Sequence, residues 1–356
     1  MSGPPPQRGP RLRDLGVPIG RLDAGPEDAI TDVPGVRVGH VTVWRDAPQV
    51  ARTGVTAIVP GDDLVGSPVR AGAAVLNGAG EMTGFVTASE WRMVETPVYL
   101  TSTMAVGRIY DGAVSVAIES DPVVADEVVI PVVGECDDSW LSTAAPVQVE
   151  AADAGRAVAA AAGGPVAEGA VGAGTGMVCF GWKGGIGTAS RRVGEHMVGA
   201  LVLANFGVAP DLRFDGIPVG RVLPDPEDAP PPAGSCIAVL ATDLPLDGAQ
   251  LERLARRAGL GLARTGSVAH HGSGEIFLAF SVAGRQPRGQ GATAPGFAEE
   301  GLNDVFTAAV EATEAAVLNC LWAAPDVTGR DGRSTPGLPH EPVLELLRRS
   351  RPNLGS

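Results

Sequence analysis

A proline-rich, acidic stretch divides the chain and limits what can fold around it. Residues 224–234 read Pro-Asp-Pro-Glu-Asp-Ala-Pro-Pro-Pro-Ala-Gly, a composition that builds neither a core helix nor a core strand. Residues 236–240, directly after Ser235, form an uninterrupted apolar run typical of a buried strand. We therefore expect a linker that ends at Gly234, next to an element inside the fold.

Short apolar runs and helical patterns alternate on both sides of this linker. Strands are predicted at 33–43 (with a turn at Pro34-Gly35), 113–118, 128–133, 236–240 and 276–282, and further apolar runs lie at 53–59, 73–76 and 196–205. Helices are predicted at 149–162, 248–258 and 298–323. Residues 1–16 are expected to form a flexible arm, and the tail after about 325 is expected to be rich in loops. The interleaved order fits a layered α/β or α+β sandwich.

Charge and cysteine usage narrow the partners and the compartment. The 356 residues include 41 acidic and 27 basic side chains, a formal net charge of −14, which disfavours nucleic acid and anionic membranes as partners. No apolar window of about 18 residues predicts a membrane span, and the N-terminus lacks the apolar core of a signal peptide. The widely spaced cysteines predict neither a disulfide framework nor a zinc site, so we expect a reducing cytoplasm; they are Cys136, Cys179, Cys236 and Cys320.

Two motifs that could hold a cofactor or a metal ion are weak. The glycine-rich run 172–177 lacks the Gly-Lys-Ser/Thr ending of a phosphate loop, because Lys183 follows a tryptophan, so tight turns and an architectural lysine are the better interpretation. His270 and His271 are adjacent and would point to opposite faces of a strand, which disfavours joint metal ligation. Neither a cofactor nor a metal site is predicted.

Gly234-Ser235 has the layout of a self-cleaving precursor. An exposed linker leaves the peptide bond accessible, and glycine, which lacks a Cβ atom, admits attack by the hydroxyl of the next residue. Cleavage would leave Ser235 at a new N-terminus, where an α-amine with a pKa of about 7.7–8.0 can act as its base. From these residues alone, an ordinary strand entry after a loop is the more common interpretation of this dipeptide.

A second polar group precedes the predicted strand at 276–282. Ser273 and Glu275 are two residues apart, so they share one face if this segment is extended. A hydroxyl relay from Ser235 to Ser273, polarised by a carboxylate, is sound chemistry for nucleophile activation. The alternative is a polar turn before a strand.

Short segments distributed over most of the chain carry a family resemblance. They are 31–40 (TDVPGVRVGH), 76–84 (LNGAGEMTG), 95–97 (ETP), 131–135 (PVVGE), 172–177 (GAGTGM), 182–188 (WKGGIGT), 204–207 (ANFG), 234–235 (GS), 241–243 (ATD), 272–275 (GSGE) and 328–333 (TGRDGR). In this order they resemble the L-aminopeptidase/D-esterase family, which includes the β-peptidyl aminopeptidases. The likeness runs from about Leu12 to Pro339.

The resemblance implies a fold and an activity. The fold would be α+β, a four-layer αββα sandwich, in which residues 17–234 form an α chain and residues 235–356 a β chain of one domain. The chain would cut itself between Gly234 and Ser235, and the two pieces would stay together and assemble into a tetramer of αβ heterodimers. The activity would be that of a metal-independent serine aminopeptidase or amidase, acting on small peptides or amino-acid amides and esters.

The resemblance also implies catalytic roles. Ser235 would be the nucleophile that forms an acyl-enzyme, and Ser273 and Glu275 match the residues that orient and activate it. Asn205 matches the oxyanion-hole amide, whose N–H could lower the barrier by roughly 3 kcal/mol; a turn residue is the alternative.

Substrate binding is implied for two residues. Glu135 matches the acid that binds the substrate's free amine, and an ion pair with an arginine is the alternative. Trp140 is a candidate for the amine pocket, with simple packing as the alternative. Asn77 and Glu81 fit the family pattern without an assigned role. Residues 136–143 (CDDSWLST) depart from it close to the expected substrate site, so the side-chain preference is open.

Two rival functions remain at this point. An N-acyltransferase on the same fold would pass the acyl group to an amine, although the ornithine acetyltransferases that share the fold carry threonine at the position of Ser235. A catalytically inactive binding protein would not need Ser235, Ser273, Glu275 and Asn205 together.

Overall fold

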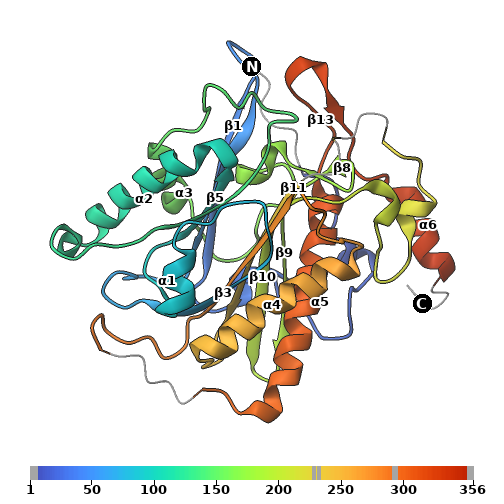
Figure 1. Cartoon of the computed structure of the whole chain (residues 1–356). Coiled ribbons are helices and arrows are strands. Elements are labelled where there is room, and N and C mark those ends of the chain that lie inside the picture. Colours follow the sequence, from blue (N-terminus) through green and yellow to red (C-terminus); the bar gives the residue numbers. More distant parts are fainter. Residues whose placement is uncertain (1–6, 227–229, 231–233, 291–295, 351–356) are drawn as a thin grey trace.

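Two β-sheets form the centre of this computed structural model, which describes residues 7–226, 230, 234–290 and 296–350 (Figure 1). The six-stranded sheet has the order β4-β3-β12-β11-β10-β9 and the four-stranded sheet the order β1-β2-β5-β6. The larger sheet comprises β3 (Val69–Gly78), β4 (Met93–Val94), β9 (Gly185–Val193), β10 (His196–Asn205), β11 (Gly234–Thr242) and β12 (Ser273–Ser281). The smaller comprises β1 (Arg37–Arg45), β2 (Ala51–Val59), β5 (Val98–Ser102) and β6 (Val132–Cys136).

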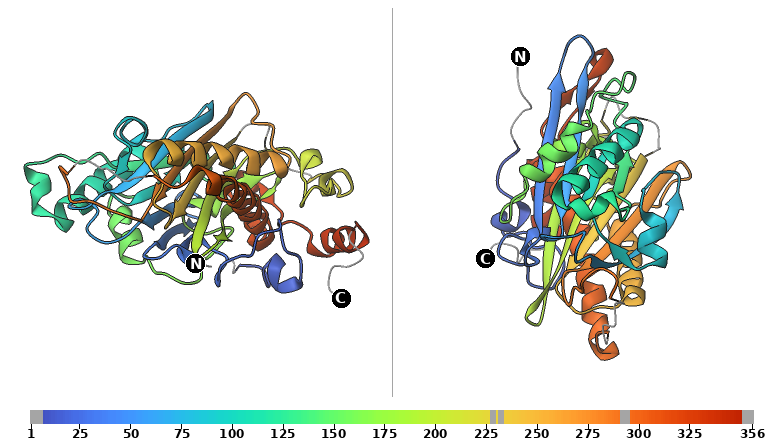
Figure 2. Two further views of the ribbon diagram at one scale, coloured as in Figure 1. Left: turned by 90° about the horizontal axis from the view of Figure 1, so that it is seen from below. Right: turned by 90° about the vertical axis from the view of Figure 1, so that its left-hand side faces the viewer.

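Helices cover the outer face of each sheet. Helices α4 (Gly248–Arg264) and α5 (Leu302–Ala323) pack on the six-stranded sheet, and α2 (Val106–Ser120) and α3 (Ala152–Ala159) pack on the four-stranded sheet. Figure 2 shows the strands of both sheets running along the same dimension of the molecule. The remaining α-helices and strands are α1 (Phe85–Glu90), α6 (His340–Ser350), β7 (Val178–Cys179), β8 (Trp182–Lys183), β13 (Val327–Thr328) and β14 (Ser334–Thr335). The order helices, sheet, sheet, helices confirms the predicted αββα sandwich.

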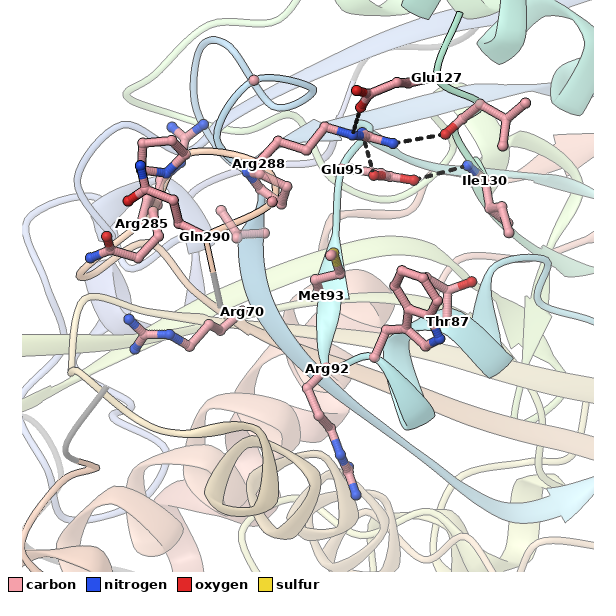
Figure 3. Close-up of a pocket in the computed structure, with 18 of the residues that line it drawn as sticks. Arg70, Thr87, Arg92, Met93, Glu95, Glu127, Ile130, Arg285, Arg288 and Gln290 are labelled. Carbon is pink, nitrogen blue, oxygen red and sulfur yellow. Dashed lines mark hydrogen bonds and ion pairs between the residues drawn. The ribbon is translucent and has the colours of Figure 1, made fainter. Parts of the chain in front are cut away.

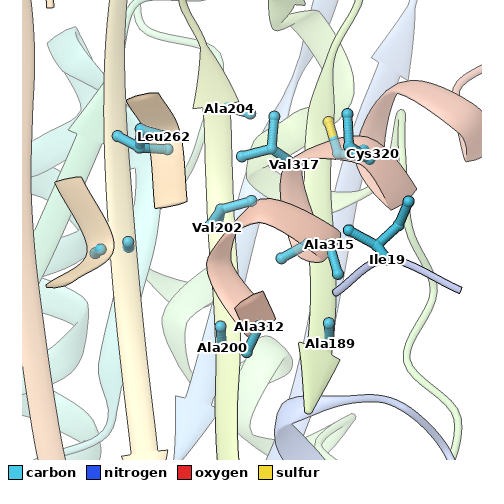
Figure 4. Close-up of a cluster of buried hydrophobic side chains, with 14 of the residues drawn as sticks. Ile19, Ala189, Ala200, Val202, Ala204, Leu262, Ala312, Ala315, Val317 and Cys320 are labelled. Atoms are coloured by element: carbon cyan, nitrogen blue, oxygen red, sulfur yellow. The ribbon is translucent and has the colours of Figure 1, made fainter. Parts of the chain in front are cut away.

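Three apolar cores fill the spaces between these layers. Under α4 and α5, small side chains such as Ala200, Ala312 and Ala315 let a helix approach the strands closely (Figure 4). Between the two sheets the core contains larger, branched side chains, such as Leu203 and Ile237. A third core lies under α2 and α3. Burial of such aliphatic side chains, at roughly 1.5–3 kcal/mol each for the larger ones, is the main force holding the layers together.

Helix α5 is long and apolar for a reason internal to the fold. With the preceding turn it spans Glu299–Ala323, 25 residues with a mean hydropathy of 1.2 over its best window, long and apolar enough to cross a membrane. In this structure, however, 94 % of that window is buried inside the protein. The helix has this composition because it packs on β9, β10 and α4, as a core helix does.

Several sequence predictions need correction. Residues 113–118, predicted as a strand, lie in helix α2, where Ile109, Ala113 and Ala117 recur every four residues and are buried. The strand predicted at 128–133 begins only at Val132, and Val128 is 81 % exposed. Of the predicted strand at 33–43, the part after the Pro34-Gly35 turn is extended, since β1 begins at Arg37.

Two of the three predicted helices are confirmed, one is shorter than predicted, and one further helix was not predicted. The helices predicted at 248–258 and 298–323 are confirmed as α4 and α5, whereas the one predicted at 149–162 is shortened to α3. The tail expected to be rich in loops contains α6, which buries Val343, Leu344 and Leu347 at a helical spacing.

The two segments predicted to lack core elements are partly described. Residues 227–229 and 231–233 of the predicted linker, and residues 1–6 of the predicted arm, lie outside the described residues. The rest of the arm is packed on the body: Leu12 is buried, and Arg11 forms an ion pair with Glu168 at 3.0 Å and donates to the carbonyl of Thr188 at 2.7 Å.

Candidate active site

The four predicted catalytic residues lie at the same end of three adjacent inner strands of the six-stranded sheet. Asn205 ends β10, Ser235 lies at the start of β11, and Ser273 starts β12. Ser235 pairs with Asn205 on the antiparallel side and with Gly274 on the parallel side. Because paired residues point to the same face, Ser235 and Asn205 are directed, like Ile237, into the space between the sheets.

Ser273 and Glu275 flank the backbone on the other face of the sheet. Ser273 pairs with Gly234, and Glu275 pairs with Cys236, whose thiol lies in the core under the helices. The Ser273–Glu275 group is therefore next to the peptide bond between Gly234 and Ser235. Cys236 is fully buried, and burial raises its pKa well above the ordinary value, so it remains a neutral thiol and a poor nucleophile.

Gly234 is required by close packing. A Cβ atom at this position would lie 1.9 Å from the carbonyl oxygen of Asn205, which no side chain can tolerate. The residue before the predicted nucleophile is therefore held tightly against the strand that supplies the predicted oxyanion amide.

Glu275 is a buried carboxylate with spare hydrogen-bonding capacity. The Ser273 hydroxyl donates to Glu275 Oε1, which confirms that the two side chains share a face. Oε2 is buried and has no hydrogen-bond partner among the described residues. Burial raises the pKa of Glu275, and the hydrogen bond from Ser273 opposes that rise. Ser273 can thus pass a proton to a carboxylate that binds it readily.

Asn77 holds the turn that carries Ser273, a role that the sequence alone does not indicate. Its Nδ2 donates to the carbonyl oxygens of His270 at 3.0 Å, His271 at 3.2 Å and Ser273 at 2.5 Å. The contact joins residues about two hundred positions apart, so no local pattern could reveal it. His270 and His271 thus contribute backbone carbonyls to this turn.

Glu135 faces the same space from the other sheet. Its Oε1 accepts from the backbone N–H of Glu81 at 2.8 Å, and its Oε2 accepts from the Thr103 hydroxyl. In the described part of the chain no basic side chain forms an ion pair with it, which removes the alternative of a structural arginine partner. Burial raises the pKa of Glu135. A buried carboxylate of this kind attracts an ammonium group from a ligand.

Asn205 is oriented by two hydrogen bonds and keeps one N–H free for another. Its Oδ1 accepts from the backbone of Val178 at 2.8 Å, and its Nδ2 donates to the carbonyl of Asp137 at 2.9 Å. The second Nδ2 hydrogen remains for a developing oxyanion. The Asp137 contact also places the atypical run 136–143 directly beside the site.

Lys183 organises the glycine-rich run 172–177. Its buried ammonium donates to the carbonyls of Gly174, Met177 and Gly184 at 2.7–2.9 Å. Burial lowers the pKa of Lys183 to about 7. The contacts favour an architectural role, because all three acceptors are backbone atoms of the loops around it.

Trp140 has the contacts of a packing residue. The Arg333 guanidinium lies 4.3 Å from its ring centroid, and the ring packs against a small cluster that includes Leu141 and Val178. Val178 in turn donates to Asn205. A role for Trp140 in the amine pocket stays a prediction.

Two cavities border β3, the larger at the start of the strand and the smaller near its end, where Gly78 pairs with Gly274. The larger, of about 1270 Å³, is lined by apolar and charged side chains, and among the charged ones Arg288 pairs with Glu95 at 2.7 Å and with Glu127 at 2.8 Å (Figure 3). It does not include any of the predicted catalytic residues. The smaller, of about 520 Å³, borders Gly80 and Glu81, and therefore lies next to Glu135.

The chain resembles known proteins over nearly its whole length. Residues 28–335 match the model of peptidase family S58. The β-peptidyl aminopeptidase BapA of Sphingosinicella microcystinivorans is 39 % identical, covering 99 % of this chain and 95 % of its own length.

Solved structures agree with this match. The β-aminopeptidase of a Burkholderia species is 42 % identical with a TM-score of 0.87, covering 98 % of this chain and 99 % of its own. The L-aminopeptidase D-Ala-esterase/amidase of Ochrobactrum anthropi, described as a prototype serine aminopeptidase and a variant of the Ntn hydrolase fold, is 38 % identical with a TM-score of 0.89, covering 98 % and 100 %.

These likenesses confirm the predicted resemblance, the fold and the general activity. The chain is a hydrolase with an aminopeptidase or amidase function. Both the identity and the coverage far exceed what a shared fold alone would give, and we conclude that this protein belongs to peptidase family S58.

Proposed function

We propose that this protein cuts itself between Gly234 and Ser235 and then uses Ser235 to remove the N-terminal residue of short peptides, amides or esters. The observation that carries the proposal is that Ser235, Asn205 and the hydrogen-bonded Ser273–Glu275 pair lie at the same end of three adjacent strands, the pair on the opposite face of the sheet from the other two. The remaining contacts support a proposed role for each group.

Self-cleavage would begin with attack of the Ser235 hydroxyl on the carbonyl carbon of Gly234. The C–N bond breaks as the new C–O ester forms, and the released nitrogen takes up the proton that the hydroxyl loses. Water then hydrolyses the ester to a carboxylate on Gly234 and a free hydroxyl on Ser235. Glu275, paired with the residue next to Ser235 and holding an unpartnered oxygen, is well placed to receive the new α-ammonium group.

Substrate turnover would use the same atoms. The Ser235 hydroxyl attacks the carbonyl of the substrate's N-terminal residue, the free N–H of Asn205 stabilises the oxyanion, and the leaving amine or alcohol departs with a proton. Water then hydrolyses the acyl-enzyme. Glu135 binds the substrate's ammonium group, which restricts the reaction to a free N-terminus. The names of the relatives support a trial of both β-amino-acid and L-α-amino-acid substrates.

The intact mass of the purified protein tests the first step. The uncut chain has a mass of 36.1 kDa, and cleavage yields pieces of about 24 and 12 kDa, the smaller beginning Ser-Cys-Ile-Ala. The Ser235→Ala variant is expected to stay whole and to lose at least about 10³-fold in kcat on aminoacyl p-nitroanilides. A wild-type chain that stays whole and inactive contradicts the proposal. Faster acyl transfer to an added amine than to water would favour the acyltransferase.

We propose in addition a cytoplasmic homo-oligomer. Its support is the exposure of large apolar side chains around α1, with Val86 at 72 %, Trp91 at 75 % and Val128 at 81 %. The four cysteines are all free and buried, as suits a reducing compartment. Analytical ultracentrifugation distinguishes a monomer from an oligomer. If the Trp91→Asp variant forms an oligomer of the same mass as the wild type, the interface lies elsewhere.

A further inference from the structure

Lys183 is the only lysine among the 27 lysine and arginine side chains of this chain, and it is fully buried. Its ammonium group donates to the carbonyl oxygens of Gly174 at 2.9 Å, Met177 at 2.7 Å and Gly184 at 2.8 Å. An ammonium group carries three donors on one tetrahedral nitrogen, whereas the donors of a guanidinium group lie in a plane and point apart. Three carbonyls that converge on one point therefore give a reason for lysine rather than arginine at this position.

One peptide unit links Lys183 to Asn205. It consists of the carbonyl of Met177 and the N–H of Val178. The oxygen accepts from Lys183 at 2.7 Å, and the N–H donates to Asn205 Oδ1 at 2.8 Å. Because a peptide unit is planar, its carbonyl oxygen and its N–H cannot turn independently. The ammonium group that fixes the direction of the oxygen therefore also fixes the direction of the N–H that holds Asn205.

The side-chain amide of Asn205 has its plane set by two contacts. Its Oδ1 accepts from Val178, and one Nδ2 hydrogen goes to the carbonyl of Asp137 at 2.9 Å. With both ends of the amide held, the direction of the second Nδ2 hydrogen is fixed as well. The N–H that is proposed to meet the oxyanion is thus aimed by the contact with Val178 and, through that contact, by Lys183.

Resting on the proposed function, in which Asn205 stabilises the oxyanion, we infer that Lys183 is a positioning residue for that amide. Without the ammonium group, the Met177 carbonyl keeps one donor, the N–H of Gly184 at 3.0 Å, so its peptide unit is loosened rather than released. Complete loss of an oxyanion donor lowers kcat by about 10²- to 10³-fold, and a donor that is only misdirected costs less, so a loss of at least about tenfold is expected.

The first test is Lys183→Met, which keeps an unbranched apolar side chain and removes the three donors. The substrate is the p-nitroanilide of leucine or of β-homoleucine, whichever the wild-type enzyme turns over. The value of kcat is expected to fall at least about tenfold while KM changes less than about twofold, because the oxyanion contact forms only in the transition state. The constants refer to the cut fraction of each preparation, measured by intact mass.

A second readout separates the oxyanion contact from general damage to the site. The aldehyde of the same amino acid adds the Ser235 hydroxyl across its C=O bond, which gives a hemiacetal with a tetrahedral carbon. Its inhibition constant is expected to rise in Lys183→Met by about the factor by which kcat falls, since both depend on the same N–H. The free amino acid forms no such adduct, and its inhibition constant is expected to change less than about twofold.

Arg70 offers a matched control. It is a buried cation, 7 % exposed, that donates to the carbonyl of Gly284 at 2.5 Å and lines the larger cavity, away from the predicted catalytic residues. Arg70→Met is expected to lower Tm and to leave kcat and aldehyde inhibition within about twofold of the wild type. If Lys183→Met does not fold, Lys183→Gln, which keeps two N–H donors, takes its place, and circular dichroism reports folding.

The possible results divide clearly. Cut Lys183 variants with a lowered Tm but wild-type kcat and aldehyde inhibition overturn this inference alone. A folded Lys183 variant that stays uncut is compared with Asn205→Ala, and the inference requires that Asn205→Ala stay uncut as well. A wild-type enzyme that hydrolyses neither substrate overturns the proposed function too.

Discussion

Two of the regions that hold buried carboxylates differ in how those carboxylates are compensated. Where the N-terminal segment meets β9 and α5, each carboxylate has a cation: Glu311 pairs with Arg191 at 3.7 Å and Asp28 with the same Arg191 at 3.1 Å. At the catalytic edge, Glu135 and Glu275 accept hydrogen bonds but have no basic partner in the described part of the chain.

This difference supports a structural role for the paired carboxylates and the proposed functional role for Glu135 and Glu275. A buried ion pair is satisfied within the fold, and removing one member leaves the other uncompensated. A buried carboxylate without a cation is costly in the free protein, and that cost falls when a ligand or a new chain end supplies the positive charge. The unpaired carboxylates are therefore the groups that we propose bind ammonium groups.

The largest expected effects come from the same substitution in each region. Glu311→Gln leaves Arg191 undercompensated and is expected to cost about 3 kcal/mol of unfolding free energy. Glu135→Gln is expected to change that free energy by less than about 1 kcal/mol and to lower kcat/KM about 100-fold, through a lost charge-assisted contact of about 3 kcal/mol. Urea unfolding is measured in the uncut Ser235→Ala background and kinetics in the wild-type background. Equal losses of stability in the two variants would contradict the distinction.

A smaller effect is expected from the amide that positions Ser273. Asn77→Ala removes three hydrogen bonds to the turn and is expected to lower kcat and the rate of self-cleavage about tenfold, with KM little changed. Asn77→Asp should be worse, because a carboxylate cannot donate to three carbonyls. Asn319, which donates to the carbonyl of Thr188 in the paired region, is the control: Asn319→Ala should lower Tm and spare kcat. A lower Tm with normal kcat in Asn77→Ala would make its role structural only.

The smallest expected effect is a pH dependence of stability at Glu275. Burial raises the pKa of this carboxyl above its ordinary value of 4.5, so the folded state binds the proton more tightly than the unfolded state. The free energy of unfolding therefore falls as the pH rises from about 4.5 through the folded-state pKa. The loss is about 1.4 kcal/mol for each pH unit that separates the folded-state pKa from the unfolded-state pKa. Glu275→Gln in the Ser235→Ala background should remove this loss. Its Tm advantage should be near zero at pH 4 and grow above pH 5; an advantage independent of pH would refute the assignment.

The elements with strong local patterns could be predicted from the sequence. Helices α4 and α5 repeat their apolar residues at helical spacing, and β11 is an unbroken apolar run after a linker. Helix α2 was missed because its Ala- and Val-rich segment resembles a strand in a short window, and only the longer spacing of its buried residues reveals the helix. Helix α6 was missed because its few apolar residues follow a stretch rich in turns.

The candidate site also has a part that could be predicted from the sequence and a part that could not. The shared face of Ser273 and Glu275 follows from their spacing, and the structure confirms it. The approach of Glu135 to Gly80, the three contacts of Asn77 and the contact of Asn205 with Asp137 all join distant segments, so no local pattern contains them.

The strand order of the six-stranded sheet has a consequence for how the protein could be refolded. Strands β12 and β11, which follow residue 234, lie between β3 and β10, which precede it. A cut after Gly234 would therefore leave two polypeptides interlocked through two separate ladders of backbone hydrogen bonds. Refolding after denaturation would then be a bimolecular reaction between the two polypeptides, and its rate would depend on protein concentration. The uncut Ser235→Ala chain would refold as a single molecule at a rate that does not.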